Sequence, residues 1–144
     1  MNERMAEVLL VEDNPDDVEL ALHAFKQHQI SDRIQVARDG EEALQLLFAA
    51  ADTEGNLPRV VLLDRKLPKI DGLEVLRQLR ADPRTRRLPI VMLTASAQEH
   101  DVIESYDLGV NSYIVKPVAY KHFSETVRQL GLYWLALNQP VPEG

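Results

Sequence analysis

The chain has 144 residues, the length of one ordinary globular domain, and its 45% hydrophobic and 27% charged residues are typical of a folded protein. With no cysteine, it has no disulfide framework, thiolate zinc site or cysteine nucleophile. The net charge of −7 argues against nucleic acid or an anionic membrane as a partner, because both attract basic surfaces. No apolar run approaches the length of a membrane span, and residues 1–7 lack a signal peptide's apolar stretch, so we expect a cytoplasmic protein.

Five short apolar runs are spread along the chain. The first, Val8 to Val11, is continuous, which is typical of a strand buried on both faces. The runs predict strands over residues 8–11, 34–37, 60–63, 89–93 and 112–115.

An amphipathic segment with helical spacing follows each run. Asn14 and Pro15 suit the start of the first helix, Pro83 must end the third, and Gly109 suits the end of the fourth. The last helix is predicted from about residue 120 towards residue 137. Strand–helix repeats joined by right-handed crossovers predict an α/β fold, a doubly wound, five-stranded parallel (βα)5 sheet with helices on both faces.

Polar residues end four of the predicted strands. Glu12 and Asp13 follow the first, Asp64 the third, Thr94 the fourth and Lys116 the fifth. In an open parallel sheet these ends meet at one edge, where ligands bind. Grouped carboxylates repel one another unless a cation neutralises them, and oxygen ligands without histidine or cysteine favour Mg²⁺.

Asp64 stands alone at its strand end and is the candidate nucleophile, because a carboxylate can form an acyl phosphate. Mg²⁺ and Lys116 would supply the positive charge that phosphoryl transfer requires, and Thr94 a hydrogen-bond donor. Taken singly, each residue also has a structural explanation, such as a helix cap, a turn or an exposed lysine. Their occurrence together at four strand ends favours the common function.

The chain resembles the receiver domain of two-component response regulators over about residues 6–130. The matching segments are VLLVED at 8–13, LDRKLPKIDG at 63–72, LTA at 93–95 and YIVKP at 113–117. The resemblance implies the flavodoxin-like receiver fold and a single receiver domain over residues 1–144. In that reading the core spans about 6–130, and a C-terminal helix extension and tail span 131–144. It also implies a histidine kinase as partner and no enzymatic activity of the chain's own.

The resemblance further implies the roles of the acidic residues. Asp64 is the expected phosphoacceptor, and Glu12 and Asp13 are the acidic pair at the metal, with Lys66 lending its backbone carbonyl to Mg²⁺. We expect Asp13 to be the main side-chain ligand and the longer Glu12 to act mostly through water.

Three further positions match the family. Lys116 would pair with the phosphoryl group, and the peptide bond between Lys116 and Pro117 would be cis. Thr94 and Tyr113 match the switch hydroxyl and the switch aromatic residue, which predicts a two-state conformational switch. With few residues left after the last helix for a DNA-binding effector, we expect output through protein–protein contacts or a phosphorelay.

Two features of the chain are more particular. Arg65 stands where an apolar residue is usual, and Lys66 occupies a position that is often neutral, so two cations flank the expected phosphate. The long loop at 50–58 and the apolar C-terminal extension resemble the single-domain regulators that partner bacterial phytochromes.

Other classes fit the residues less well. A haloacid-dehalogenase-type phosphatase requires a second aspartate at position 66, which is lysine here. An FMN carrier requires a phosphate loop after the first strand, where Glu12 and Asp13 would repel phosphate. A receiver-like scaffold that is never phosphorylated stays open as an alternative.

The last helix predicts a homodimer. Its apolar residues step by 4, 3, 4 and 3 positions, through Phe123, Val127, Leu130, Trp134 and Leu137. The last two extend past the expected core, so we expect them to have little of their own monomer left to contact. We therefore expect Trp134 and Leu137 in a dimer interface on the face formed by the fourth helix, fifth strand and last helix. In the alternative, the helix bends at Gly131 and covers the core of its own monomer.

Overall fold

The computed structural model describes residues 6–30, 33–53, 55–116 and 119–142. Within these residues the strands are β1 (Val8–Val11), β2 (Ile34–Ala37), β3 (Val60–Leu63), β4 (Ile90–Thr94) and β5 (Ser112–Val115). The helices are α1 (Pro15–Gln27), α2 (Gly40–Ala51), α3 (Gly72–Ala81), α4 (Glu99–Asp107) and α5 (Tyr120–Gly131), followed by a π-helix over Leu132–Leu137. The predicted strands are confirmed, except that β4 lies one residue later. None of the described helices is long and apolar enough to cross a bilayer.

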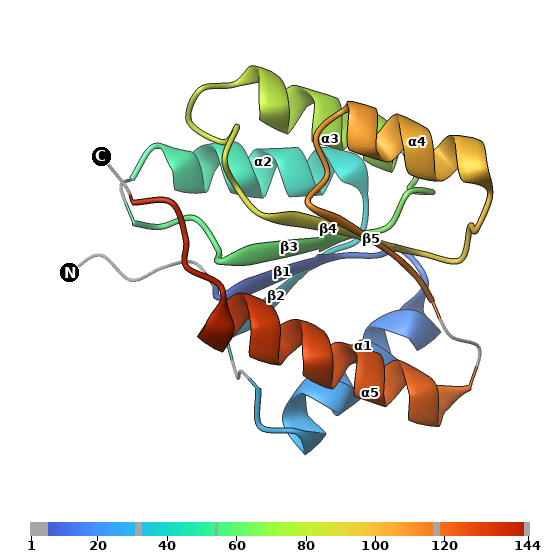
Figure 1. Ribbon diagram of the computed structural model, residues 1–144. Helices are drawn as coiled ribbons and strands as arrows, with labels where there is room; N and C mark the ends of the chain where they lie inside the picture. The colour runs from blue at the N-terminus through green and yellow to red at the C-terminus, as the bar shows by residue number, and fades with distance from the viewer. Residues whose placement is uncertain (1–5, 31–32, 54, 117–118, 143–144) are drawn as a thin grey trace.

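The strands form one parallel sheet in the order β2-β1-β3-β4-β5. Helices α1 and α5 cover one face, and α2, α3 and α4 cover the other (Figure 1). Successive side chains of a strand point to opposite faces, so Leu9 packs in the cluster under α2 and α3 while Leu10 packs under α1 and α5. This two-sided burial explains the continuous apolar run of β1, and the predicted doubly wound fold is confirmed.

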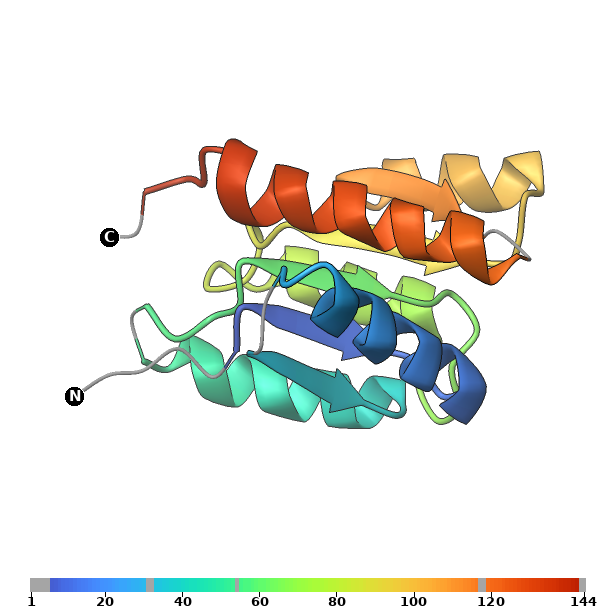
Figure 2. The same cartoon turned by 90° about the horizontal axis from the view of Figure 1, so that it is seen from below.

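The strand register aligns the carboxyl ends of the strands. Val11 is level with Ala37 on β2 and with Leu63 on β3, and Thr94 is level with Val115 on β5. The strand arrowheads accordingly lie together on one side of the molecule (Figure 2). Residues that follow the strands are therefore neighbours in space.

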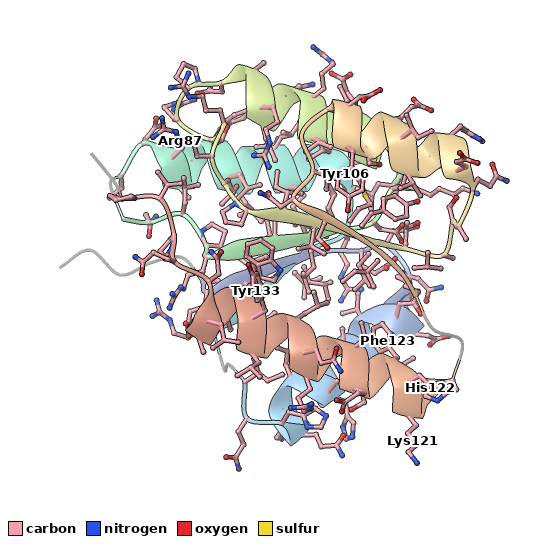
Figure 3. The ribbon with its side chains drawn as sticks, in the orientation of Figure 1. Arg87, Tyr106, Lys121, His122, Phe123 and Tyr133 are labelled. Atoms are coloured by element: carbon pink, nitrogen blue, oxygen red, sulfur yellow. The ribbon has the colours of Figure 1, made fainter. Side chains whose placement is uncertain are left out.

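The C-terminal helix changes its winding after Gly131. Phe123 lies near the start of α5 and is buried, and Tyr133 lies just after the end of α5 (Figure 3). Beyond Gly131 the segment is a π-helix, in which the Asn138 N–H donates to the Tyr133 carbonyl at 2.6 Å, five residues back. The prediction of a helix towards residue 137 is thus correct in extent, but wrong in treating it as one regular α-helix.

The two residues expected at a dimer interface lie in different surroundings. Trp134 packs against the cluster under α1 and α5, with its ring edge-on to Tyr133 at 5.0 Å between centroids. The expectation that Trp134 has little of its own monomer left to contact is therefore wrong, because the segment stays close to the core. Leu137 is 66% exposed.

Candidate functional site

Three carboxylates meet at the carboxyl edge of the sheet. Glu12 and Asp13 follow β1, and Asp64 follows β3. The parallel ladder continues past the strands, since the Asp64 N–H donates to the Val11 carbonyl at 3.1 Å and the Glu12 N–H to the Ala37 carbonyl at 3.0 Å. One carboxylate oxygen from each acid lies within 4.8 Å of those of the other two. The structure thus brings together the acids that the sequence singled out.

The ammonium of Lys116 lies among these acids. The Lys116 N–H donates to the Thr94 carbonyl at 2.8 Å, which fixes the chain just after β5. Its Nζ donates to Oε1 of Glu12, to Oδ2 of Asp17 at 2.9 Å and to Oδ2 of Asp64 at 3.2 Å. Pro117 lies outside the described residues, and with it the expected cis bond.

Burial and charge act against each other in this cluster. Glu12 is only 3% exposed, and burial raises its pKa to about 7 despite the opposing hydrogen bond from Lys116. Burial on its own would lower the pKa of Lys116, but hydrogen bonds to Glu12 and Asp17 and the charge of Asp64 outweigh it, so this pKa is raised. Lys116 is therefore charged and neutralises part of the acidic cluster.

The donor set of this edge fits a small, hard divalent cation. Glu12, Asp13 and Asp64 offer carboxylate oxygens close together, and Asp13 is exposed, which leaves room for the water ligands that Mg²⁺ retains. The Lys66 N–H donates to Oδ1 of Asp64 at 3.3 Å and so fixes the backbone that carries the Lys66 carbonyl. Glu12, Asp13, Asp64 and the Lys66 carbonyl are the groups that would hold the ion.

Thr94 and Tyr113 are linked through Ser96. Thr94 is buried at the end of β4, and its Oγ1 accepts a hydrogen bond from the Ser96 N–H at 3.5 Å. The Tyr113 ring packs against the core cluster under α2 and α3, and its hydroxyl donates to the Ser96 carbonyl at 2.9 Å. Burial raises the pKa of Tyr113. Both predicted switch residues therefore contact the loop between β4 and α4.

Sequence reasoning missed one member of the cluster, Asp17. This residue lies in the first turn of α1, whose start is capped by the Asn14 side chain accepting from the Asp16 and Asp17 N–H groups. The predicted cap already placed the start of that helix at the same edge of the sheet. An acid one turn after Asp13 was thus the signal that could have identified it.

An ion pair made by the residue that follows Asp64 was also missed. The guanidinium of Arg65 lies 3.0 Å from Oδ1 of Asp101 in the first turn of α4. The second carboxylate oxygen of Asp101 accepts a hydrogen bond from the Ser96 hydroxyl. Arg65 stands out in the sequence as an unusual residue at its position, but no local sequence pattern indicates that Asp101 is its partner.

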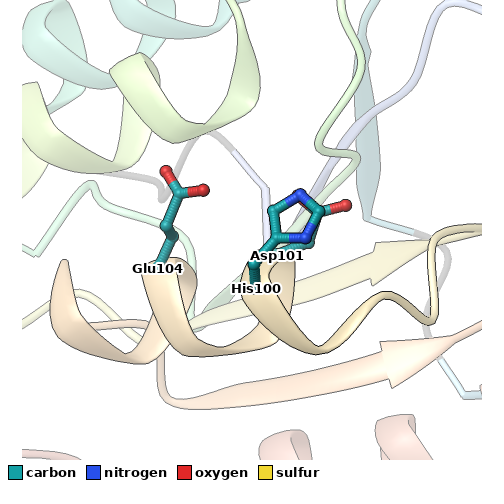
Figure 4. Close-up of side chains that lie close together, drawn as sticks. All are labelled: His100, Asp101 and Glu104. Atoms are coloured by element: carbon teal, nitrogen blue, oxygen red, sulfur yellow. The ribbon is translucent and has the colours of Figure 1, made fainter.

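His100, Asp101 and Glu104 form a second group of potential metal ligands on α4 (Figure 4). Asp101 is already engaged by Arg65 and Ser96, and Nε2 of His100 lies 3.1 Å from its Oδ1. His100 and Glu104 are exposed. The ion pair of Asp101 accounts for this group, so we assign no metal to it.

Comparisons with known proteins agree with this geometry. The family model described as "Response regulator receiver domain" matches residues 8–128. The probable methanogenesis regulatory protein FilR2 of Methanothrix harundinacea (strain 6Ac) is 41% identical over 132 residues, which cover 92% of this chain and 85% of FilR2. The response regulator Rcp1 of Synechocystis sp. (strain ATCC 27184 / PCC 6803 / Kazusa) is 38% identical over 129 residues, covering 89% of this chain and 88% of Rcp1.

Solved structures give the same result. The phosphorylated cyanobacterial phytochrome response regulator RcpA superposes with a TM-score of 0.86 at 34% identity, covering 95% of this chain and 99% of RcpA. The Mn²⁺-bound form of Rcp1 has a TM-score of 0.84 at 36% identity, with coverage of 95% and 99%. The family match, the parallel sheet and the acids at its carboxyl edge lead to one conclusion: the chain belongs to the response regulator receiver domains of two-component signalling, and is similar to phytochrome response regulators.

Proposed function

We propose that this receiver domain accepts a phosphoryl group on Asp64 from a histidine kinase, in a reaction that requires Mg²⁺. The observation that carries the proposal is the position of the Lys116 ammonium, which donates to both Asp64 and Glu12 inside the cluster of acids. A charged lysine held against a strand-end aspartate suits an anionic group attached to that aspartate.

In the transfer, a carboxylate oxygen of Asp64 forms a bond to phosphorus while the bond from phosphorus to the kinase's imidazole nitrogen breaks. The imidazole leaves with the electron pair of that bond, and Asp64 becomes an acyl phosphate. Charge gathers on the phosphoryl oxygens in such a transfer, so positioned cations do most of the catalytic work. Lys116 provides one, and bound Mg²⁺ supplies further positive charge.

The contacts of Thr94 support a route from the phosphoryl group to the β4–α4 loop. Thr94 Oγ1 accepts from the Ser96 N–H, and the Ser96 carbonyl accepts from the Tyr113 hydroxyl. A phosphoryl oxygen that accepts a hydrogen bond from Thr94 draws this hydroxyl towards Asp64 and alters both contacts of Ser96. Tyr113 then moves with the loop, which gives a two-state switch whose output is a changed protein surface.

The likeness to Rcp1 and RcpA supports a phytochrome-type histidine kinase as the phosphodonor. RcpA is a cyanobacterial phytochrome response regulator, and its structure superposes on 95% of this chain at 34% sequence identity. We infer that output passes by protein–protein contact or by onward phosphotransfer, in the cytoplasm.

Intact-mass analysis tests the proposal. After incubation with acetyl phosphate and Mg²⁺, the wild type is expected to gain one phosphoryl group, and neither Asp64→Asn nor the wild type in EDTA should gain it. In a second experiment, a phytochrome kinase is first phosphorylated with radiolabelled ATP and then mixed with each protein. The labelled phosphoryl group should move to the wild type and not to Asp64→Asn. A wild-type chain that stays unmodified under both conditions contradicts the proposal and favours the unphosphorylated scaffold.

A further inference from the structure

The ion pair between Arg65 and Asp101 joins the residue after the phosphoacceptor to the first turn of α4. The guanidinium and the carboxylate are 3.0 Å apart, and the two side chains are only 19% and 7% exposed. Exposed ion pairs contribute little, because water screens them, whereas a pair shielded to this degree is costly to separate. The pair therefore constrains α4 relative to the loop that carries Asp64.

Asp101 passes this constraint on to the switch residues. It accepts a hydrogen bond from the Ser96 hydroxyl, and the Ser96 carbonyl holds the hydroxyl of Tyr113 at 2.9 Å. The Ser96 N–H donates to Thr94. A continuous series of direct contacts thus runs from Arg65 through Asp101 and Ser96 to both Thr94 and Tyr113.

The side chain of Arg65 also carries a buried donor, Nε, for which the described part of the chain offers no acceptor. Among the described residues, its Nε is buried and makes no hydrogen bond, although its main chain is anchored by the Gly72 N–H, which donates to the Arg65 carbonyl at 2.9 Å. A buried donor without a partner is unfavourable, and it is stabilised when an acceptor arrives. A phosphoryl group on the adjacent Asp64 would bring such acceptors.

We propose that Arg65 is a positioning residue that couples phosphorylation of Asp64 to the first turn of α4 through its ion pair with Asp101. This inference rests on the proposed phosphorylation of Asp64. In the unmodified chain, the pair holds Ser96 and, with it, the inward-packed Tyr113. The phosphoryl group adds negative charge beside Arg65 and competes with Asp101 for the guanidinium. The pair weakens, and the first turn of α4 is released.

Hydrogen exchange measured by mass spectrometry on the full chain tests the coupling. In the wild type, phosphorylation with acetyl phosphate and Mg²⁺ should speed exchange across residues 97–104 by about tenfold, as expected for losing one contact to a charged group. Asp101→Asn should exchange this fast before phosphorylation and change little after it. Arg65→Met should behave in the same way, and Arg65→Lys, which keeps the charge but not the planar fork, should fall between.

Controls separate a coupling from general destabilisation. Arg77→Met removes the exposed ion pair of Arg77 with Glu74 on α3 and should leave exchange in α4 unchanged. The double variant of Arg65→Met and Asp101→Asn should exchange no faster than either single variant, because both remove the same pair.

Three results would overturn the inference. The first is that Arg65→Met and Asp101→Asn have additive effects on the exchange rate of the unmodified chain. The second is that unmodified Asp101→Asn shows the same exchange pattern as the unmodified wild type. The third is an equal response of the wild type and Asp101→Asn to phosphorylation. A chain that takes no phosphoryl group contradicts the proposed function itself, and the unmodified comparison then still reports whether the pair holds α4.

Discussion

The ammonium of Lys116 donates a 2.9 Å hydrogen bond to Oδ2 of Asp17, so the lysine that follows β5 is tied to the first turn of α1. The same ammonium contacts Glu12 and Asp64, and its pKa is raised by these acids. It therefore acts as an internal cation for the cluster. A divalent metal at Glu12 and Asp64 has to share these ligands with an existing positive charge.

This sharing predicts that Lys116→Met binds Mg²⁺ more tightly than the wild type, although it should lose the ammonium that serves phosphoryl transfer. Without the ammonium, the three carboxylates repel one another more strongly and gain more from a divalent ion. The measurement is the rise in melting temperature between EDTA and excess Mg²⁺, which should be larger in the variant. Lys69→Met, at an exposed lysine, is the control. A smaller rise in Lys116→Met than in the wild type would contradict the expectation.

Arg80→Lys should destabilise the fold by about 2 kcal/mol, because the planar fork of Arg80 reaches several acceptors that a lysine cannot hold together. Its nitrogens donate to the carbonyls of Gly109 and Leu88 at 2.8 Å each and to Oδ1 of Asn111 at 2.9 Å. Urea unfolding provides the measurement. Arg77→Lys on the same helix alters only an exposed pair and should change stability by less than about 0.5 kcal/mol. Equal losses of unfolding free energy in the two variants would show that the contacts of Arg80 stabilise the fold no more than an exposed ion pair does.

The contribution of Asp101 to stability should depend on pH. The Ser96 hydrogen bond, followed by the charge of Arg65, lowers the pKa of Asp101 below its ordinary value of 3.8. A carboxyl whose pKa is lower in the folded than in the unfolded state stabilises the fold above its unfolded pKa, and this stabilisation is lost as pH falls through the folded value. Asp101→Asn should therefore destabilise equally at about pH 7 and pH 5, and less below about pH 4. Urea unfolding of both proteins across this range checks the sign, and a difference that grows on acidification would refute it.

Gly131 allows the C-terminal helix to approach Ile30 closely. A Cβ at position 131 would lie 2.2 Å from Cγ2 of Ile30, so Gly131→Ala should cost roughly 1–3 kcal/mol as overpacking. In an Ile30→Ala background the Ile30 atoms at 2.2 and 3.0 Å are gone and only the Cβ contact at 3.2 Å remains, so the same substitution should cost about 1–2 kcal/mol less than it does in the wild type. Urea unfolding of the four proteins gives the cycle. Equal costs in both backgrounds would show that the close approach is not what requires glycine.

The homodimer remains a prediction, and the structure leaves Leu137 rather than Trp134 as the residue available to anchor it. Large apolar side chains are exposed on α4 and on the C-terminal π-helix, among them Ile103 and Leu137. We expect sedimentation at about 10 μM to give a dimer that Leu137→Ala weakens. Trp134→Ala should instead lower the melting temperature, because this ring packs on its own monomer. Leu20→Ala, on α1, is the control, and a monomeric wild type would contradict the interface.

The limits of sequence reasoning follow from how each contact arises. Asp13 and Asp64 could be placed together because apolar runs end at them and parallel strands share one edge. The pairing of Arg65 with Asp101 depends on how α4 is rotated about its axis, which no local pattern reports. The π-helix was equally invisible, because the apolar spacing continues through Trp134 as if the helix were regular.

The π-helix also limits how a second chain could lie along this helix. An i→i+5 helix turns through a smaller angle per residue than an α-helix, so positions after Gly131 fall progressively out of phase with those before it. Leu137 therefore faces solvent, although Leu130, seven positions earlier, is buried. Knobs-into-holes packing needs its apolar positions to stay on one seam, and here the seam is interrupted at residue 131. A partner can bind α5 on one side or the extension on another, but a coiled coil running through both is geometrically excluded.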